Sequence, residues 1–442
     1  MNWTSEQILA LAPDAASAKN GQGLAIGRKW QNCGRSQSVV WGECQGSGSK
    51  PYRTQIDLTE PAFRCSCPSR KFPCKHGLGL FLLLAQSDAL FTDTSPPDWV
   101  SEWLDSRQQR QVKQQEKAAE KAAAIADPQA QAKRQEKRAK KVDAGVAELQ
   151  QWLTDFLRRG LATAPELSYQ QWDQVAARMV DAQAPGLARR LQAMAGTAHS
   201  GSGWPERLLS QLGELHLLLE SYQRLESLPP ALQADVRSQM GWTMSQEEVL
   251  AKPGQVVTDR WAVLGQRDEV EDPLRIRRIW LQGVSSHTLA LILLFAHGKQ
   301  SFEVSFLPGT VVAAELAFFP SAYPQRAIVQ SRSDHAEAIT PTIVPGIPQI
   351  ADLFTQYSHA LSHQPWLERL VVSLQGVTVG QESAQGYLRD RNNAVLPLVA
   401  NYPALWELIA LGGGHAIDLT GEWNGREFYP LSAWVQGEFV VL

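Results

Sequence analysis

The sequence lacks the features that mark secreted and membrane proteins. The N-terminal residues MNWTSEQILALAPD contain neither a basic segment nor the long apolar stretch of a secretory signal. Apolar runs such as LALILLFA (Leu289–Ala296) fall far short of the roughly 20 residues that a membrane helix needs. There are 5 cysteines among the 442 residues, and nothing marks the compartment as oxidising, which argues against disulfides. These absences predict a soluble, cytoplasmic protein without membrane contact.

Catalytic motifs are also missing. The segment GSGSK (Gly46–Lys50) has the composition of a phosphate loop but not its spacing, and is better explained as a hairpin turn. His359 and His363 are four residues apart on a predicted helix, but Ala360 replaces the general-base Glu of H-E-x-x-H proteases. The run Gly412–His415 has no strand–helix setting for a dinucleotide, and no nucleophile elbow is present. We therefore expect a protein that is not an enzyme.

Charge is divided unevenly along the chain. The formal net charge of −3 combines +7 for residues 1–141 with −10 for residues 142–442. A basic segment is the electrostatic footprint of a nucleic-acid binder, but it can equally dock an acidic protein or the acidic half of the same chain. Charge alone leaves these alternatives open.

The most informative residues present are Cys65, Cys67, Cys74 and His76, in the pattern C-x-C-x6-C-x-H. Three thiolates and an imidazole complete the tetrahedron of a structural Zn²⁺ site and leave no position for water. In a strand, residues i and i+2 share a face, so Cys65 and Cys67 can bind one ion. The apolar run after His76 predicts a helix that starts at about Cys74, with one ligand before its first turn and one within it.

Other residues near these ligands have simpler explanations. Cys33 and Cys44 are expected to be buried as small apolar residues, because a four-coordinate site is already complete. The metal site with its three thiolates has a formal charge of −1, which nearby basic residues offset: Arg64, Arg70, Lys71 and Lys75.

The ligand spacing resembles the SWIM zinc finger, a short ββα module. The resemblance extends to the two strands predicted within Val39–Leu58, to FRCSC, and to the helix predicted in PCKHGLGLFLLL. The whole chain is similar to bacterial SWIM zinc finger family proteins, and VDAQAPGLARRL (Val180–Leu191) and YPQRAIVQ (Tyr323–Gln330) share that similarity. The resemblance implies zinc binding and contacts with DNA or protein partners, and it implies no reaction.

The rest of the chain predicts a multi-domain α+β protein. Helical apolar spacing follows Lys141, strand-like segments follow Pro253, and a helix precedes a last β region with an Asn424-Gly425 hairpin signal. QSFEVSFLP (Gln300–Pro308) is among the predicted strands of an antiparallel sheet. The expected order begins with a zinc finger domain (1–105) and a basic helical linker (106–141). A helical domain (142–252), an antiparallel β domain (253–345) and an α+β C-terminal region (346–442) follow.

Two classes of function remain open from the sequence. The first is a zinc-binding interaction protein whose finger contacts a protein or, through residues 1–141, DNA or RNA; a protein partner is favoured because the chain as a whole is acidic. The second is an enzyme or enzyme accessory with an unrecognised site in the C-terminal β regions. No motif identifies a small-molecule substrate.

Overall fold

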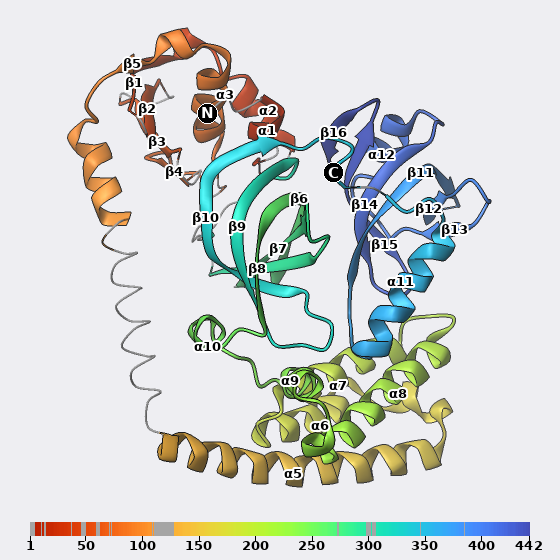
Figure 1. Ribbon diagram of the computed structural model, residues 1–442. Helices are drawn as coiled ribbons and strands as arrows, with labels where there is room; N and C mark the ends of the chain where they lie inside the picture. The colour runs from red at the N-terminus through yellow and green to blue at the C-terminus, as the bar shows by residue number, and fades with distance from the viewer. Residues whose placement is uncertain are drawn as a thin grey trace.

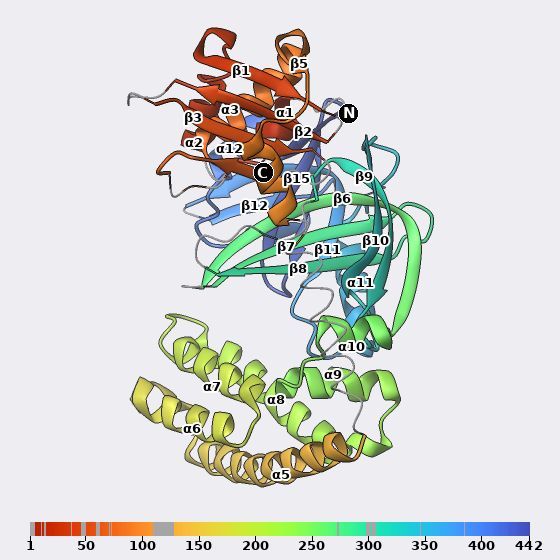
Figure 2. The same ribbon diagram turned by 90° about the vertical axis from the view of Figure 1, so that its left-hand side faces the viewer.

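The fold is a series of units along one chain. The computed structural model describes residues 5–442 except 10, 13–14, 37, 46–49, 59–61, 70, 72, 108, 110–127, 272–273, 298–301, 303–305, 345 and 384. An N-terminal module lies at one end, a helical bundle lies at the other, and two β units lie between them (Figures 1 and 2). The α+β, multi-domain prediction is confirmed.

The N-terminal module is a sheet in the order β4-β3-β2-β1-β5, covered by helices on both faces. Helix α3 packs on one face around Ile56 and Phe81, and the helix at 98–107 packs its Trp103 on the other, beside Trp41. The strands and helices are β1 (Trp30–Arg35), β2 (Val39–Cys44), β3 (Tyr52–Asp57), β4 (Ala62–Cys65), β5 (Thr92–Asp93), α1 (Ser5–Leu9), α2 (Ala15–Gln22) and α3 (Lys75–Gln86).

The predicted strand pair within residues 39–58 is confirmed. Strands β2 and β3 pair antiparallel from Val39 opposite Asp57 to Cys44 opposite Tyr52. The turn expected at residues 46–50 lies largely outside the described residues.

The helical bundle surrounds a core of leucine, methionine and aromatic side chains. Its helices are α5 (Pro128–Arg159), α6 (Tyr169–Asp181), α7 (Pro185–Ala198), α8 (Trp204–Gln223) and α9 (Pro230–Met240), followed by the short α10 (Gln246–Ala251). Ser168 and Gln171 form a capping box at the start of α6.

The predicted boundary between linker and helical domain, at Lys141 and Val142, falls inside α5. Pro128 begins this helix, in the position where proline fits without losing a hydrogen bond. The Ala, Gln, Lys and Glu residues that follow are good helix formers, so the helix forms before it reaches the bundle core. The apolar periodicity begins only where the core begins, with the buried Val142.

The first β unit is a sheet that closes on itself in the order β10-β8-β7-β6-β9, with β9 also paired to β10; we call it the closed sheet. Its strands are β6 (Gln255–Glu271), β7 (Leu274–Gly283), β8 (Leu289–His297), β9 (Thr310–Phe318) and β10 (Arg326–Ala338). The pairings are antiparallel except a short parallel contact of β10 with β8. The strand predicted at Gln300–Pro308 lies half outside the described residues, and its described residues are not in a strand.

The C-terminal unit is a sheet in the order β13-β12-β11-β14-β15-β16 with two helices. Its elements are α11 (Ile350–His363), β11 (Leu370–Glu382), β12 (Gln385–Arg389), β13 (Val395–Pro397), α12 (Leu405–Gly412), β14 (Ile417–Trp423), β15 (Phe428–Val435) and β16 (Glu438–Val441). The predicted Asn424-Gly425 turn joins β14 to β15. Gly425 has a φ of +90°, which glycine adopts without strain, and Asn424 accepts hydrogen bonds from the Arg426 and Glu427 amides.

The two β units share buried side chains. Leu264 and Trp280 of the closed sheet lie in one apolar cluster with Val371 and Leu431 of the C-terminal sheet. None of the helices within the described ranges is long and apolar enough to cross a bilayer.

Candidate metal centre

The structure brings the four predicted ligands together at the junction of β4 and α3. Cys65 ends β4, Cys67 follows in the connecting loop, Cys74 caps α3, and His76 lies in its first turn. Their ligand atoms all lie within 4.8 Å of one another. The helix start predicted at about Cys74 is confirmed.

The donor set fits tetrahedral zinc. Cys65 Sγ lies 3.8 Å from His76 Nδ1. Bonds of about 2.3 Å to sulfur and about 2.0 Å to nitrogen place tetrahedral ligand atoms roughly 3.6 Å apart, which agrees with this spacing. Zn²⁺ is therefore the cofactor of the module, held by Cys65, Cys67, Cys74 and His76.

Local structure fixes the position of each ligand. Cys74 has the extended backbone of a helix N-cap, with φ −77° and ψ 165°, and its carbonyl accepts a hydrogen bond from the Leu78 amide at 3.1 Å. Cys74 therefore lies at the positive end of α3. Apolar side chains of α3, such as Leu78 and Leu80, are fully buried against the sheet and anchor the helix that carries two of the ligands.

Two further residues support the ligands and were not anticipated from the sequence. Thr54 is fully buried, and its hydroxyl donates to Cys65 Sγ at 3.2 Å. The ring of Tyr52 lies 4.9 Å from that of His76, centroid to centroid. Thr54 is the register partner of Cys65 between β3 and β4, so the signal was the hairpin register rather than a residue spacing.

The protein groups influence one another's protonation strongly. Hydrogen bonds with Cys67 and Cys74, together with burial, hold the pKa of the Cys65 thiol far above its ordinary value. Hydrogen bonds with Cys65 and Cys74 hold the pKa of the Cys67 thiol far below the ordinary value of a cysteine. For His76, burial lowers the pKa, but hydrogen bonds to the two cysteines outweigh burial and raise it to about 9. Zn²⁺ binding must therefore displace protons from this cluster.

Basic side chains surround the centre. Arg64, Lys71 and Lys75 are exposed, while Arg70 lies outside the described residues. Cys33 and Cys44 are not part of the cluster. Burial raises the pKa of Cys33 to about 11 and also raises that of Cys44, which suits unreactive thiols.

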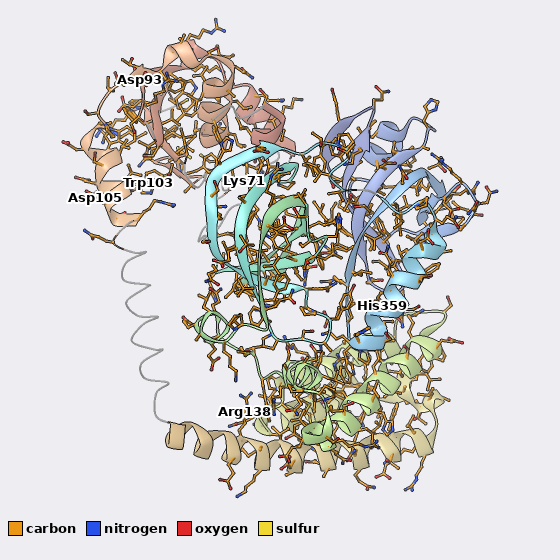
Figure 3. All side chains as sticks on the ribbon, viewed as in Figure 1. Lys71, Asp93, Trp103, Asp105, Arg138 and His359 are labelled. Atoms are coloured by element: carbon orange, nitrogen blue, oxygen red, sulfur yellow. The ribbon has the colours of Figure 1, made fainter. Side chains whose placement is uncertain are left out.

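The structure also places the motifs that were considered catalytic. His359 lies on α11, beside the bundle (Figure 3). His359 and His363 are both exposed, and their ring centroids lie 4.6 Å apart. Gly413 and Gly414 end α12 with positive φ, as a helix C-terminus requires. The two histidines thus lie on an exposed helix face, and the two glycines follow the body of α12.

Comparison with known families supports the metal centre. Residues 52–85 match the SWIM zinc finger, and residues 137–240 match the SWIM-associated four-helix bundle domain. The first match contains the four ligands, and the second spans the bundle from within α5 to the end of α9. No curated protein and no solved structure matches the chain.

Proposed function

We propose that this protein, with its SWIM zinc finger and SWIM-associated helical bundle, is a non-catalytic interaction protein whose finger docks a protein partner. The main support is the metal centre, where four protein ligands leave Zn²⁺ no open position for substrate or water. The role of such a metal is to hold β4 and α3 in a fixed arrangement. The function then resides in the surface that this arrangement presents.

The surface beside the metal centre is basic. Arg64 on β4 and Lys75 at the start of α3 are both exposed. Among the strands that the structure describes, β4 lies at the edge of its sheet and pairs with β3 alone. These features favour a partner that offers acidic side chains.

Ion pairs inside the module favour protein over nucleic acid. Arg35 pairs with Asp93 at 2.7 Å, and Arg53 pairs with Glu43 at 3.3 Å. Arg107 likewise pairs with Asp57 at 3.3 Å. Cations engaged in this way contribute less to phosphate binding, which depends on neutralising many phosphates at once.

The docking proposal is tested by affinity purification of the intact protein with and without nuclease. The matched variants are Arg64→Glu with Lys75→Glu at the finger, and Arg158→Glu at an exposed position of α5 as the control. Zinc content is measured in each preparation. We expect nuclease-resistant partners that the finger variant loses and the control keeps.

Two results would redirect the proposal. Nuclease-sensitive capture, with affinity for DNA or RNA that falls steeply as salt rises, would assign the basic surface to nucleic acid. Capture that is the same in the finger variant and in the control would remove the finger from recognition.

The structural role of zinc has its own test. Three thiolates place negative charge on the metal and weaken its ability to acidify water. The cobalt-substituted protein should show a tetrahedral, thiolate-rich spectrum that added cyanide does not change at short times. A rapid change would reveal an exchangeable ligand and support the enzyme class instead.

A further inference from the structure

A cleft of about 970 Å³ lies where the bundle, the closed sheet and residues 364–369 meet. Helices α7, α8 and α9 form one wall, and β7, β8 and the segment leading into β10 form another. Residues 364–369, which connect α11 to β11, form the third. The four zinc ligands are not among the residues that line it.

The cleft is rich in arginine. Three carboxylates line it, Glu214, Asp235 and Glu368, against six guanidinium groups. The arginines are Arg189, Arg190, Arg237, Arg278, Arg326 and Arg369. This excess of positive charge occurs in the acidic half of the chain, so it is a local feature and not a consequence of composition.

Several of these charges have partners in the protein. Arg190 pairs with Glu214 at 3.5 Å, and Arg278 pairs with Glu269. Arg369 lies 3.9 Å from the same Glu269. The backbone of the cleft wall is also fixed, because Asp235 accepts hydrogen bonds from the Ala322 amide at 2.8 Å and from Gln364 at 3.2 Å.

Arg326 and Gln325 differ from these residues. No carboxylate within the described residues forms an ion pair with Arg326, whose guanidinium packs over the ring of Phe319 at 4.2 Å. Burial alone lowers its pKa. Gln325 is only 7% exposed, and its Nε2 donor has no hydrogen-bond partner among the residues that the structure describes. A buried donor without an acceptor destabilises a fold, so Gln325, next to a half-buried arginine without an ion pair, requires an explanation.

The wall beside them is apolar. Leu291, Leu293 and Phe295 lie on one face of β8 and line the cleft. Ala290 and Ile292 lie on the opposite face and pack in the core of the closed sheet. Phe295 is 47% exposed. The unbroken apolar run in β8 follows from these two apolar faces, one toward the core and one toward the cleft.

We infer that the cleft binds an organic oxyanion. Its phosphate or carboxylate accepts hydrogen bonds from the Arg326 guanidinium and the Gln325 amide. Its apolar portion lies against Leu291, Leu293 and Phe295. The anion supplies the acceptor that the buried Gln325 amide lacks and a counter-charge for the half-buried Arg326 guanidinium, whose fork suits the geometry of either oxyanion.

The test is calorimetric titration of the full-length, zinc-loaded protein with phenyl phosphate, benzoate and inorganic phosphate. At least one organic anion should bind more tightly than inorganic phosphate, and the comparison of phenyl phosphate with benzoate, which share the phenyl ring, identifies the head group. R326M and Q325L should each weaken that binding about tenfold or more, as expected for the loss of a charge-assisted or buried hydrogen bond. R260M is the matched control, because Arg260 is an exposed arginine of β6 that does not line the cleft.

Two further readouts separate binding from folding. F295A changes an exposed side chain and should weaken the organic anion without changing the affinity for inorganic phosphate. R326M should melt no lower than the unmodified protein, since it removes a partly desolvated charge that forms no ion pair with the described residues. The inference is wrong if neither organic anion binds at millimolar concentration, if only inorganic phosphate binds, or if R326M and Q325L bind as the unmodified protein does.

Discussion

The zinc ligands illustrate how much a few side chains determine. Cys65→Ser or His76→Ala should release Zn²⁺, because each removes one of four ligands from a closed site. We expect about one zinc per chain in the unmodified protein and a loss of protection from hydrogen exchange across residues 30–90 in the variants. The bundle, with its own core, should stay folded. Elemental analysis that finds no zinc in metal-replete protein would contradict the assignment.

Thr54 extends this dependence beyond the ligands. Thr54→Val keeps the shape of the fully buried side chain but removes the hydroxyl that donates to Cys65 Sγ. Residues that form hydrogen bonds with metal ligands typically strengthen metal affinity by about 10–100-fold. Competition with a chromophoric chelator should therefore show weaker zinc binding in a variant that still folds when zinc is in excess. Equal affinity would assign Thr54 a packing role only.

The sequence predicts the ligands and not their support for a physical reason. The four ligands lie within twelve residues, and their types alone specify zinc. Thr54 joins them only through the pairing of β3 with β4, which depends on strand register. Gln325 and Arg326 are adjacent in the sequence, but their missing partners become apparent only when the bundle and the closed sheet are in place.

At the scale of elements, α7 approaches α9 so closely that only glycine fits. A Cβ at Gly186 would lie 2.0 Å from the Gln239 carbonyl oxygen, which is backbone and cannot move aside. Gly186→Ala should therefore lower the free energy of unfolding by about 1–3 kcal/mol or more. Gly196→Ala is the matched control on the same helix, because a Cβ there meets nothing within 4 Å. Gly196→Ala should raise the free energy of unfolding by about 0.5–1 kcal/mol. Urea denaturation measures this quantity for both variants.

Asp259 on β6 stabilises the turn between β7 and β8. Its carboxylate accepts hydrogen bonds from the Ser286 amide at 2.8 Å and from the Ser285 amide at 3.2 Å. Burial raises the pKa of Asp259, but the hydrogen bonds outweigh it and leave the pKa below its ordinary value. The stabilisation is therefore complete above the unfolded pKa of about 3.9 and is lost as pH falls through the lower folded value.

The corresponding measurement is Asp259→Ala across a range of pH. At pH 7 the free energy of unfolding of the variant should be about 1 kcal/mol lower than that of the unmodified protein. This value is reduced because the carboxylate is exposed to solvent. The difference from the unmodified protein should shrink as pH approaches 3. A difference that stays constant with pH would mean that the loss comes from packing and not from the ionised carboxylate.

Elements were predictable where their pattern was local. The spacing of apolar residues after Lys141 predicted a helical domain, and Asn424-Gly425 predicted the hairpin of β14 and β15. The first part of α5 lacks apolar periodicity, so the sequence predicted it as a helical linker and not as part of a bundle helix. The closure of the sheet depends on the contact between Arg326 on β10 and Leu291 on β8, which no local pattern encodes.

The whole molecule is held together by buried contacts between units. Glu422 of the C-terminal sheet is 2% exposed and accepts a hydrogen bond from Trp280 of the closed sheet at 2.7 Å. Arg267 reaches the same carboxylate at 3.4 Å. A buried carboxylate with such partners favours one arrangement of the two β units, since any other would remove its hydrogen bond from Trp280 and its ion pair with Arg267.

Trp366 provides the corresponding connection to the bundle. It belongs to the segment between α11 and β11, yet it is 3% exposed within the bundle core, and its indole donates to the Glu214 carbonyl at 3.1 Å. The sequence gives no sign of this contact, because Trp366 is separated from its partner by 152 residues. Trp366→Ala should lower the free energy of unfolding by about 3–5 kcal/mol, because it leaves a large cavity in the bundle core.

Removal of the Trp366 side chain should also make the bundle unfold independently of the β units, because Trp366 connects the C-terminal region to the bundle core. We expect scanning calorimetry of Trp366→Ala to resolve a separate, earlier transition for the bundle, while the β units unfold near their original temperature. Trp406→Ala, which changes a tryptophan that is 72% exposed on α12, is the matched control and should leave the profile unchanged. If Trp366→Ala still unfolds in the original transitions, the bundle is held by its other contacts, of which Asp235 with the Ala322 amide would be the next to remove.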